Sequence, residues 1–201
     1  MLSQERKKRY RDIFFIVPIL FLLAIGCVTP EGRTKLALSA NTSLLHKDYR
    51  VAVLNFNYKY SYRKSDFGRV ESPLNSGEIV SKFMENELIG TKKFQIIDRD
   101  NISKIISEHK LNLSGLTGGI SAIGNLLNAD GILVGEVIEL STVKEVLSLK
   151  STCIFTAKLI DVKTGAIIFT FKAEEEALFG SYLDALKKAS EKFKSEIEKN
   201  F

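Results

Sequence analysis

The chain has 201 residues, of which 45% are hydrophobic and 26% are charged. These values fit one globular domain with a core of its own, and they exclude a disordered chain and a multi-span membrane protein. The formal net charge is +5, but five basic and two acidic residues among the first twelve supply +3 of it. The rest has no basic stripe with interleaved aromatic residues, so nucleic-acid binding is not favoured.

The beginning of the chain has the features of a secretory signal. Fourteen uncharged residues, 13–26, follow the basic head, whereas a transmembrane helix needs about twenty apolar residues. Ala24-Ile25-Gly26-Cys27 then resembles a bacterial lipobox, which predicts a signal peptide over residues 1–26 and a lipid on Cys27. An uncleaved N-terminal anchor helix is the alternative, and both interpretations send the rest of the chain across a membrane.

Residues 27–48 are weakly patterned, as expected of a tether between a lipid and a domain. The predicted domain covers residues 49–201. Its first segment, residues 49–58, is rich in β-formers around a continuous apolar middle, which predicts a strand buried on both faces. A polar loop with aromatic side chains follows, and then an amphipathic helix that ends at Gly90.

The triplet Asp98-Arg99-Asp100 stands between a predicted strand and a second amphipathic helix. Asp98 or Asp100 can accept hydrogen bonds from the free amides of the first helical turn, where a carboxylate is also electrostatically favourable. A catalytic acid-base pair is the other interpretation of the same residues. Capping accounts for both aspartates, so we expect them to be structural.

The second half of the domain is predicted to hold three more strands. Residues 130–140 form one, and two others flank the short turn Lys163-Thr164-Gly165 as an antiparallel hairpin. A short helix precedes these strands, and an amphipathic helix that includes Phe179 closes the chain. The order β-α-β-α-α-β-β-β-α predicts an α/β fold in a single domain, with a mixed five-stranded sheet covered by helices.

No recognisable catalytic or metal-binding pattern occurs in the sequence. The two histidines, His46 and His109, have neither ligand spacing nor a suitably placed cysteine, so we expect no metal and no serine or cysteine triad. Cys153 lies in a predicted strand and is expected to be a small buried hydrophobe. The acidic residues 174–176 are most simply a solvated strand end. The sequence therefore predicts no enzyme, no catalytic residue, no cofactor and no small-molecule substrate.

Four stretches of the sequence resemble the CsgG-like family, in the same order along the chain. They are the strand VAVLNF, the segment FQIIDRDNISKIISEHKL, the strand LNADGILVGEVIE and the hairpin LIDVKTGAIIF. By this resemblance the structural motif residues are Asp98, Arg99, Asp100, Asp130, Gly135, Thr164 and Gly165. With a lipobox in front of them, these stretches are similar to the curli production assembly/transport component and, more distantly, to LpoB-type lipoproteins.

The resemblance implies a periplasmic domain that is lipid-anchored to the outer membrane. In the curli system such proteins form a ring-shaped secretion channel, and each subunit contributes two transmembrane hairpins. Here only residues 141–148 separate two of the predicted strands, whereas a spanning hairpin needs about twenty residues. We therefore expect a non-enzymatic envelope assembly or accessory factor of the curli assembly/transport type, without a complete transmembrane barrel of its own.

A second function remains open, that of an LpoB-like lipoprotein that activates a peptidoglycan synthase. A tether of about twenty residues could span at most about 70 Å, which argues mildly against this activator. In both cases the expected partner is a protein of the cell envelope, and a homo-oligomer is one form that the assembly factor could take.

The loop after the first predicted strand is the expected contact with this partner. It carries Tyr60, Tyr62 and Phe67 beside Arg63 and Lys64. Tyrosine and arginine provide large contact areas at low entropic cost, which favours an interface. The alternative is that these are partly packed residues of a solvated connection.

Overall fold

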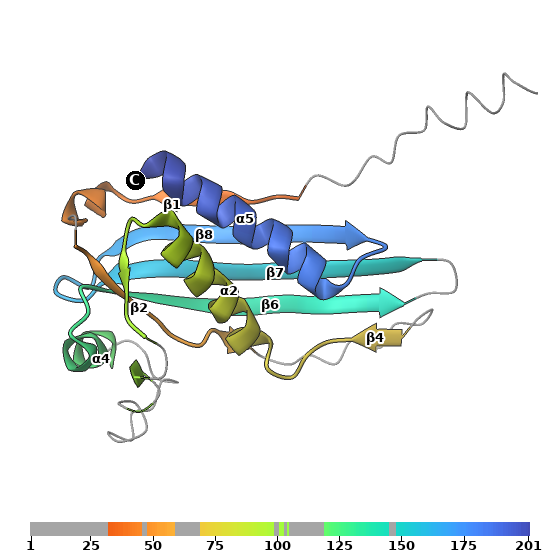
Figure 1. The fold of residues 1–201 in the computed structure, drawn as a ribbon, viewed down its shortest axis with the longest axis horizontal. Helices are drawn as coiled ribbons and strands as arrows, with labels where there is room; N and C mark the ends of the chain where they lie inside the picture. Colours follow the sequence, from red (N-terminus) through yellow and green to blue (C-terminus); the bar gives the residue numbers. More distant parts are fainter. Residues whose placement is uncertain are drawn as a thin grey trace, which may run out of the picture. The chain divides into compact units, whose positions relative to one another are not determined.

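In the computed structural model, the described residues are 32–45, 48–58, 69–98, 101–102, 104, 119–144 and 148–201. The chain divides into two units, residues 1–30 and 31–201, and all described residues belong to the second unit. An open, mixed eight-stranded sheet with helices packed against it forms this unit (Figure 1). The predicted α/β class with a mixed, helix-covered sheet is confirmed.

Five strands of this sheet correspond to the predicted ones. The long strands β6 (Gly131–Lys144), β7 (Leu149–Asp161) and β8 (Ile167–Leu178) pair antiparallel in sequence order. On its other side β6 pairs in parallel with β2 (Arg50–Val53), which pairs in parallel with β5 (Gln95–Ile96). The two directions of pairing make the sheet mixed.

Two short strands, β1 (Lys35–Leu38) and β4 (Arg69–Glu71), were not expected from the sequence, and a third, β3 (Asn57–Tyr58), is the separate end of the strand predicted over residues 49–58. β1 pairs antiparallel with β8, whereas β3 and β4 pair with β6. The 3-10 helix η1 (Ala40–Leu44) follows β1 and is capped by the Ser39 side chain. Lys35–Leu38 of the predicted tether, residues 27–48, thus belongs to the sheet, and the predicted number of five strands was too low. Such short edge strands show little hydrophobic alternation because their pairing depends on a neighbouring backbone.

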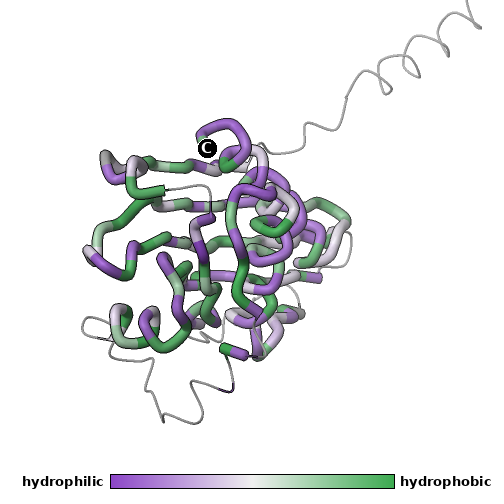
Figure 2. Tube along the Cα trace, turned by 60° about the vertical axis from the view of Figure 1, so that its left-hand side comes forward, coloured by the Kyte–Doolittle hydropathy of each residue, from purple (hydrophilic) through white to green (hydrophobic). Residues whose placement is uncertain are grey.

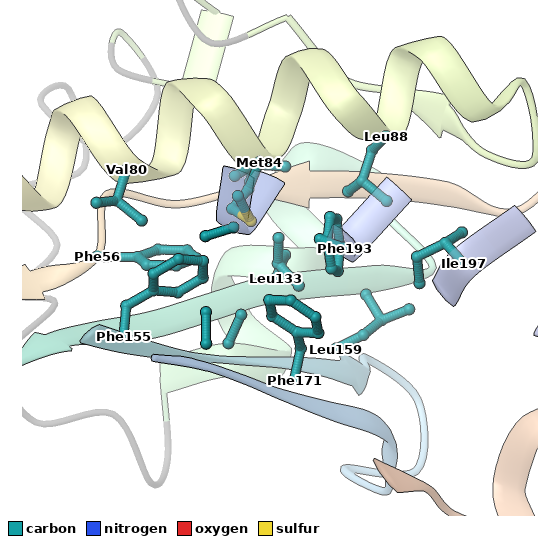
Figure 3. Packing of buried hydrophobic residues seen from close by; sticks show 14 of the residues in the cluster. Phe56, Val80, Met84, Leu88, Leu133, Phe155, Leu159, Phe171, Phe193 and Ile197 are labelled. Atoms are coloured by element: carbon teal, nitrogen blue, oxygen red, sulfur yellow. The ribbon is translucent and has the colours of Figure 1, made fainter. Parts of the chain in front are cut away.

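Two helices lie side by side on one face of the sheet, α2 (Ser76–Thr91) and α5 (Tyr182–Asn200) (Figure 1). Between them and the sheet lies the main core, which is lined with large apolar side chains. Figure 3 shows Val80, Met84 and Leu88 of α2 and Phe193 and Ile197 of α5 pointing toward it. The spacing of three or four residues on each helix explains why these side chains share one face.

A third helix, α4 (Gly119–Leu127), packs with a second, smaller cluster on the opposite face. Strand β2 lies between the two clusters. Val51 and Val53 belong to the main core, whereas Ala52 and Leu54 belong to the smaller one. This arrangement confirms the prediction that the first long apolar stretch is buried on both faces.

Hydrophobic and hydrophilic residues alternate along most described elements (Figure 2). This pattern is typical of strands and helices with one buried face. None of the helices in the described part of the chain combines the length and the apolar character that crossing a membrane requires.

The prediction that Phe179 belongs to the closing helix was wrong. Helix α5 begins at Tyr182, after a capping box in which Ser181 and Asp184 exchange hydrogen bonds. Phe179 precedes this box, with a φ of 58° that is incompatible with a right-handed helix. Its side chain is 75% exposed.

Candidate interaction surface

Asp130 joins the beginnings of β2 and β6. Its carboxylate accepts a hydrogen bond from the Arg50 N–H at 3.0 Å, and its own N–H donates to the Arg50 carbonyl at 2.9 Å. The Tyr49 hydroxyl donates to the Asp130 carbonyl oxygen and to a carboxylate oxygen of Asp161, each at 3.0 Å. Asp130 is therefore engaged in holding strands together.

The turn between β7 and β8 is built on the carboxylate of Asp161. One of its oxygens accepts the Thr164 N–H at 2.8 Å and the Thr164 hydroxyl at 2.7 Å. Gly165 has a φ of 70°, which is in the left-handed region that glycine adopts most readily. Thr164 and Gly165 thus lie beside the Tyr49–Asp161 pair, which connects them to Asp130.

The same contacts determine the protonation states of Asp161 and Tyr49. Burial by itself would raise the pKa of Asp161, but hydrogen bonds from Thr164 and Tyr49 outweigh it and lower the pKa below 3.8. Burial, together with the hydrogen bond to Asp161, raises the pKa of the Tyr49 hydroxyl far above its ordinary value. Tyr49 is consequently a neutral donor, and the arrangement stabilises the fold.

The remaining motif residues lie apart from this group. Gly135 is on β6, where a Cβ atom would overlap the Phe56 ring and the Thr156 carbonyl, so only glycine allows this close packing. The Asp98 carboxylate accepts a hydrogen bond from the Asn101 N–H at 3.3 Å, as a capping residue does. Arg99 and Asp100 are outside the described residues.

Two further predictions also fall outside the described part of the chain. The first is the lipidation site, Cys27. The second is the partner-contact loop, with Tyr60, Tyr62, Arg63, Lys64 and Phe67.

Reactive groups are scarce in the residues that the structure describes. Within these ranges no group of three or more His, Cys, Asp or Glu side chains is placed to hold a metal ion. Cys153 is buried and free, as predicted. Burial raises the pKa of its thiol, with a smaller contribution from Glu175, so a reactive thiolate is disfavoured.

Glu175 is the main residue that the sequence interpretation missed. Its side chain is only 3% exposed and lies 2.7 Å from the Lys192 ammonium of α5. The Thr34 hydroxyl donates to the same carboxylate oxygen, and the Arg33 N–H donates to the Glu174 carbonyl at 2.8 Å. The expectation of a solvated strand end was therefore wrong for Glu175, which fastens the segment before β1 to β8 and α5.

The outward face of the long strands is a candidate surface for binding a protein. In the described ranges no helix packs on the outward side of the middle of β7 and β8, and the helices α2 and α5 lie on the inward side. The outward residues combine hydroxyl, charged and β-branched side chains: Lys150, Thr152, Ile154, Thr156 and Lys158 on β7, and Thr170, Lys172, Glu174 and Glu176 on β8. Beside them a bulge in β6 contains Ile138, which is 55% exposed.

Solved structures that are similar to this chain include two with TM-scores above 0.5. A single-substitution variant of the PelC dodecamer from Paraburkholderia phytofirmans is 15% identical, with a TM-score of 0.52 over 80% of this chain and 94% of that chain. Lipoprotein GNA1162 from Neisseria meningitidis is 12% identical, with a TM-score of 0.54 over 76% and 99%. The LpoB C-terminal domain from Escherichia coli is 16% identical, with a TM-score of 0.39 over 62% and 81%.

Sequence comparison gives a more specific result. No curated protein is similar enough to the chain to count as a match. The family model of the curli production assembly/transport component CsgG matches residues 33–145, which is more than half of the chain. The matched range begins at Arg33, in the segment that Glu175 holds against β8, and includes Asp98, Asp130 and Gly135. The chain therefore belongs to the CsgG family.

Proposed function

We propose that this chain is a lipoprotein of the outer membrane that faces the periplasm and serves as a non-enzymatic assembly or accessory factor. Its membership of the CsgG family carries the proposal. The motif residues Asp130, Thr164 and Gly165 support it, because the contacts that the structure describes for them stabilise the fold. Binding of other proteins is then the activity that the surface can provide.

The connections between the long strands favour a factor that works without a transmembrane barrel of its own. Strands β6 and β7 pair as far as Lys144 and Leu149, so residues 145–148 connect them. Three residues, 179–181, join β8 to α5. A membrane-spanning hairpin would need about twenty additional residues.

The position of β1 disfavours the alternative of a peptidoglycan-synthase activator. Because Gly32 already lies against Glu175, only residues 28–31 separate the domain from Cys27. Five residue steps span at most about 18 Å. An activator that reaches across the periplasm would need a much longer free segment.

Two surfaces are the candidates for contact with the partner. One is the outward face of β7, centred on Ile154, and the other is the loop with Tyr60, Tyr62 and Phe67. PelC forms a dodecamer, and we propose self-association through these surfaces as the first possibility to test.

Site-specific photo-crosslinking in intact envelopes tests the proposal. The reporter amino acid replaces Thr156 on the outward face or Tyr62 in the loop, and the control replaces the exposed Lys199 at the end of α5. Adducts with further copies of the chain, or with one defined envelope protein, at the test positions but not at the control support an assembly factor. Adducts with a peptidoglycan synthase favour the alternative, and equal labelling at all positions contradicts both surfaces.

Lipidation is tested separately by acyl labelling. The native chain should incorporate the label and Cys27→Ala should not. Label that persists in Cys27→Ala would exclude Cys27 as the anchor.

A further inference from the structure

Three apolar side chains are exposed at or beside the connection where β8 ends and α5 begins. Leu178 is 47% exposed, Phe179 is 75% exposed and Leu183 is 43% exposed. Leu178 is the last residue of β8, and Leu183 is in the first turn of α5. We call these three residues the apolar tip.

Phe179 also has a backbone conformation that is unusual for an aromatic residue. Its φ of 58° is in the left-handed region, which is disfavoured for a bulky side chain and suits glycine or asparagine. The Phe179 N–H donates to the Leu149 carbonyl at 2.7 Å, a backbone contact that any residue other than proline could make. Nothing in that contact requires an aromatic ring. A contact outside the domain would explain the residue type.

The segment before β1 leads toward the same end of the sheet. Because β1 is antiparallel to β8, the chain that precedes β1 runs toward the C-terminal end of β8. Gly32 lies against Glu175, and Leu178 is three residues further along β8, or about 10 Å. Residues 28–31 keep Cys27 within about 18 Å of Gly32. A lipid on Cys27 would therefore be attached within about 18 Å of Gly32, which lies toward the same end of β8 as the apolar tip.

Among the described residues at this end, Glu71 and Glu176 each pair with a lysine. Lys150 pairs with Glu176 at 2.8 Å, and Lys144 pairs with Glu71 at 2.8 Å. The Asp184 carboxylate accepts the Ser181 N–H at 2.7 Å and the Ser181 hydroxyl at 2.9 Å. The two ion pairs carry no net charge, and Lys187 and Lys188 lie near the Asp184 carboxylate, which reduces repulsion from an anionic lipid surface.

We propose that Leu178, Phe179 and Leu183 insert into the lipid surface that holds the Cys27 lipid. This inference rests on the proposed lipid anchoring. The anchor holds the domain near the membrane, and the tip selects which end of the sheet faces it. Exposed apolar side chains on such an anchored domain enter the boundary between the lipid headgroups and the acyl chains.

The chain contains no tryptophan, so Phe179→Trp introduces a single fluorescent reporter. The full-length lipidated variant, purified from membranes, is reconstituted into phosphatidylethanolamine–phosphatidylglycerol vesicles with brominated acyl chains. We expect the emission to be quenched several-fold relative to unbrominated vesicles. Ile167→Trp is the matched control, because Ile167 is 39% exposed at the opposite end of β8. This control should lose little emission.

Mass spectrometry of the same preparation separates the two proposals. If Cys27 carries lipid but Trp at position 179 is quenched no more than Trp at position 167, the membrane-contact inference is wrong and the proposed anchoring stands. If the native chain carries no lipid on Cys27, the anchoring and the inference both fail. Adding Leu178→Ser and Leu183→Ser to Phe179→Trp should weaken the quenching at an unchanged circular dichroism spectrum. Unweakened quenching would show that the anchor alone places residue 179 in lipid.

Discussion

The buried carboxylate of Glu175 on β8 lies 2.7 Å from the ammonium group of Lys192 on α5. The Lys192 ammonium group is also 3.5 Å from the carbonyl oxygen of Gly32, and Thr34 donates its hydroxyl to Glu175. The pair therefore joins three parts of the chain: the segment before β1, the strand β8 and the helix α5. A buried carboxylate is tolerated only when such partners compensate its lost hydration.

Removal of one partner from this pair should be more harmful than removal of both. Lys192→Met leaves the Glu175 charge without its cation, so we expect a loss of about 1–3 kcal/mol in the free energy of unfolding. The double variant Glu175→Leu with Lys192→Met should recover most of that loss, because no buried charge remains. Urea unfolding measures both quantities. Additive losses in the double variant would contradict a coupled pair.

A side chain at position 32 should loosen β1. A Cβ atom there would overlap the Glu175 carboxylate, so Gly32→Ala must displace either the segment or the carboxylate. We expect faster hydrogen exchange at the amides of β1 and little change in β6 and β7, which have other partners. Lys35→Ala, at an exposed position of β1, is the control. Unchanged exchange in Gly32→Ala would mean that Glu175 moves instead.

The sequence predicted the long elements because their patterns are local. The apolar run 51–54 predicted a doubly buried strand, and Val51 and Ala52 do belong to cores on opposite faces. β1 was missed because three of its four residues are exposed. Its place depends on the edge of β8, which is distant in sequence.

The sequence itself contains signals for the burial of Glu175 and for the start of the closing helix. Glu175 alternates with Phe171, Ala173 and Ala177, so the period of two already places it on the buried face of its strand. Ser181 followed by Asp184 is a capping box, which begins the closing helix after Phe179. In both cases a nearby pattern, an acidic run or an apolar spacing, obscures the strand or cap signal.

The stability supplied by Asp161 should depend on pH. Its folded-state pKa is lowered, so its contribution is complete above the unfolded value of 3.8 and decreases as the pH falls through the folded value. Asp161→Asn should therefore lower the free energy of unfolding by about 1–3 kcal/mol at neutral pH. The difference from the native chain should shrink below about pH 4. A difference that grows on acidification would contradict the lowered pKa.

Replacement of Phe179 by glycine should stabilise the domain. Glycine adopts a φ of 58° without the steric cost that an aromatic residue has there, and the lost ring is mostly exposed. We expect a gain of about 0.5–1 kcal/mol, measured by urea unfolding of the protein in detergent. Gly165→Ala is the matched control, since the φ of 70° at that turn should make it destabilising by about 1 kcal/mol. A loss of stability in Phe179→Gly would instead mean that the ring packs on the domain, which would leave no exposed aromatic side chain to enter a membrane.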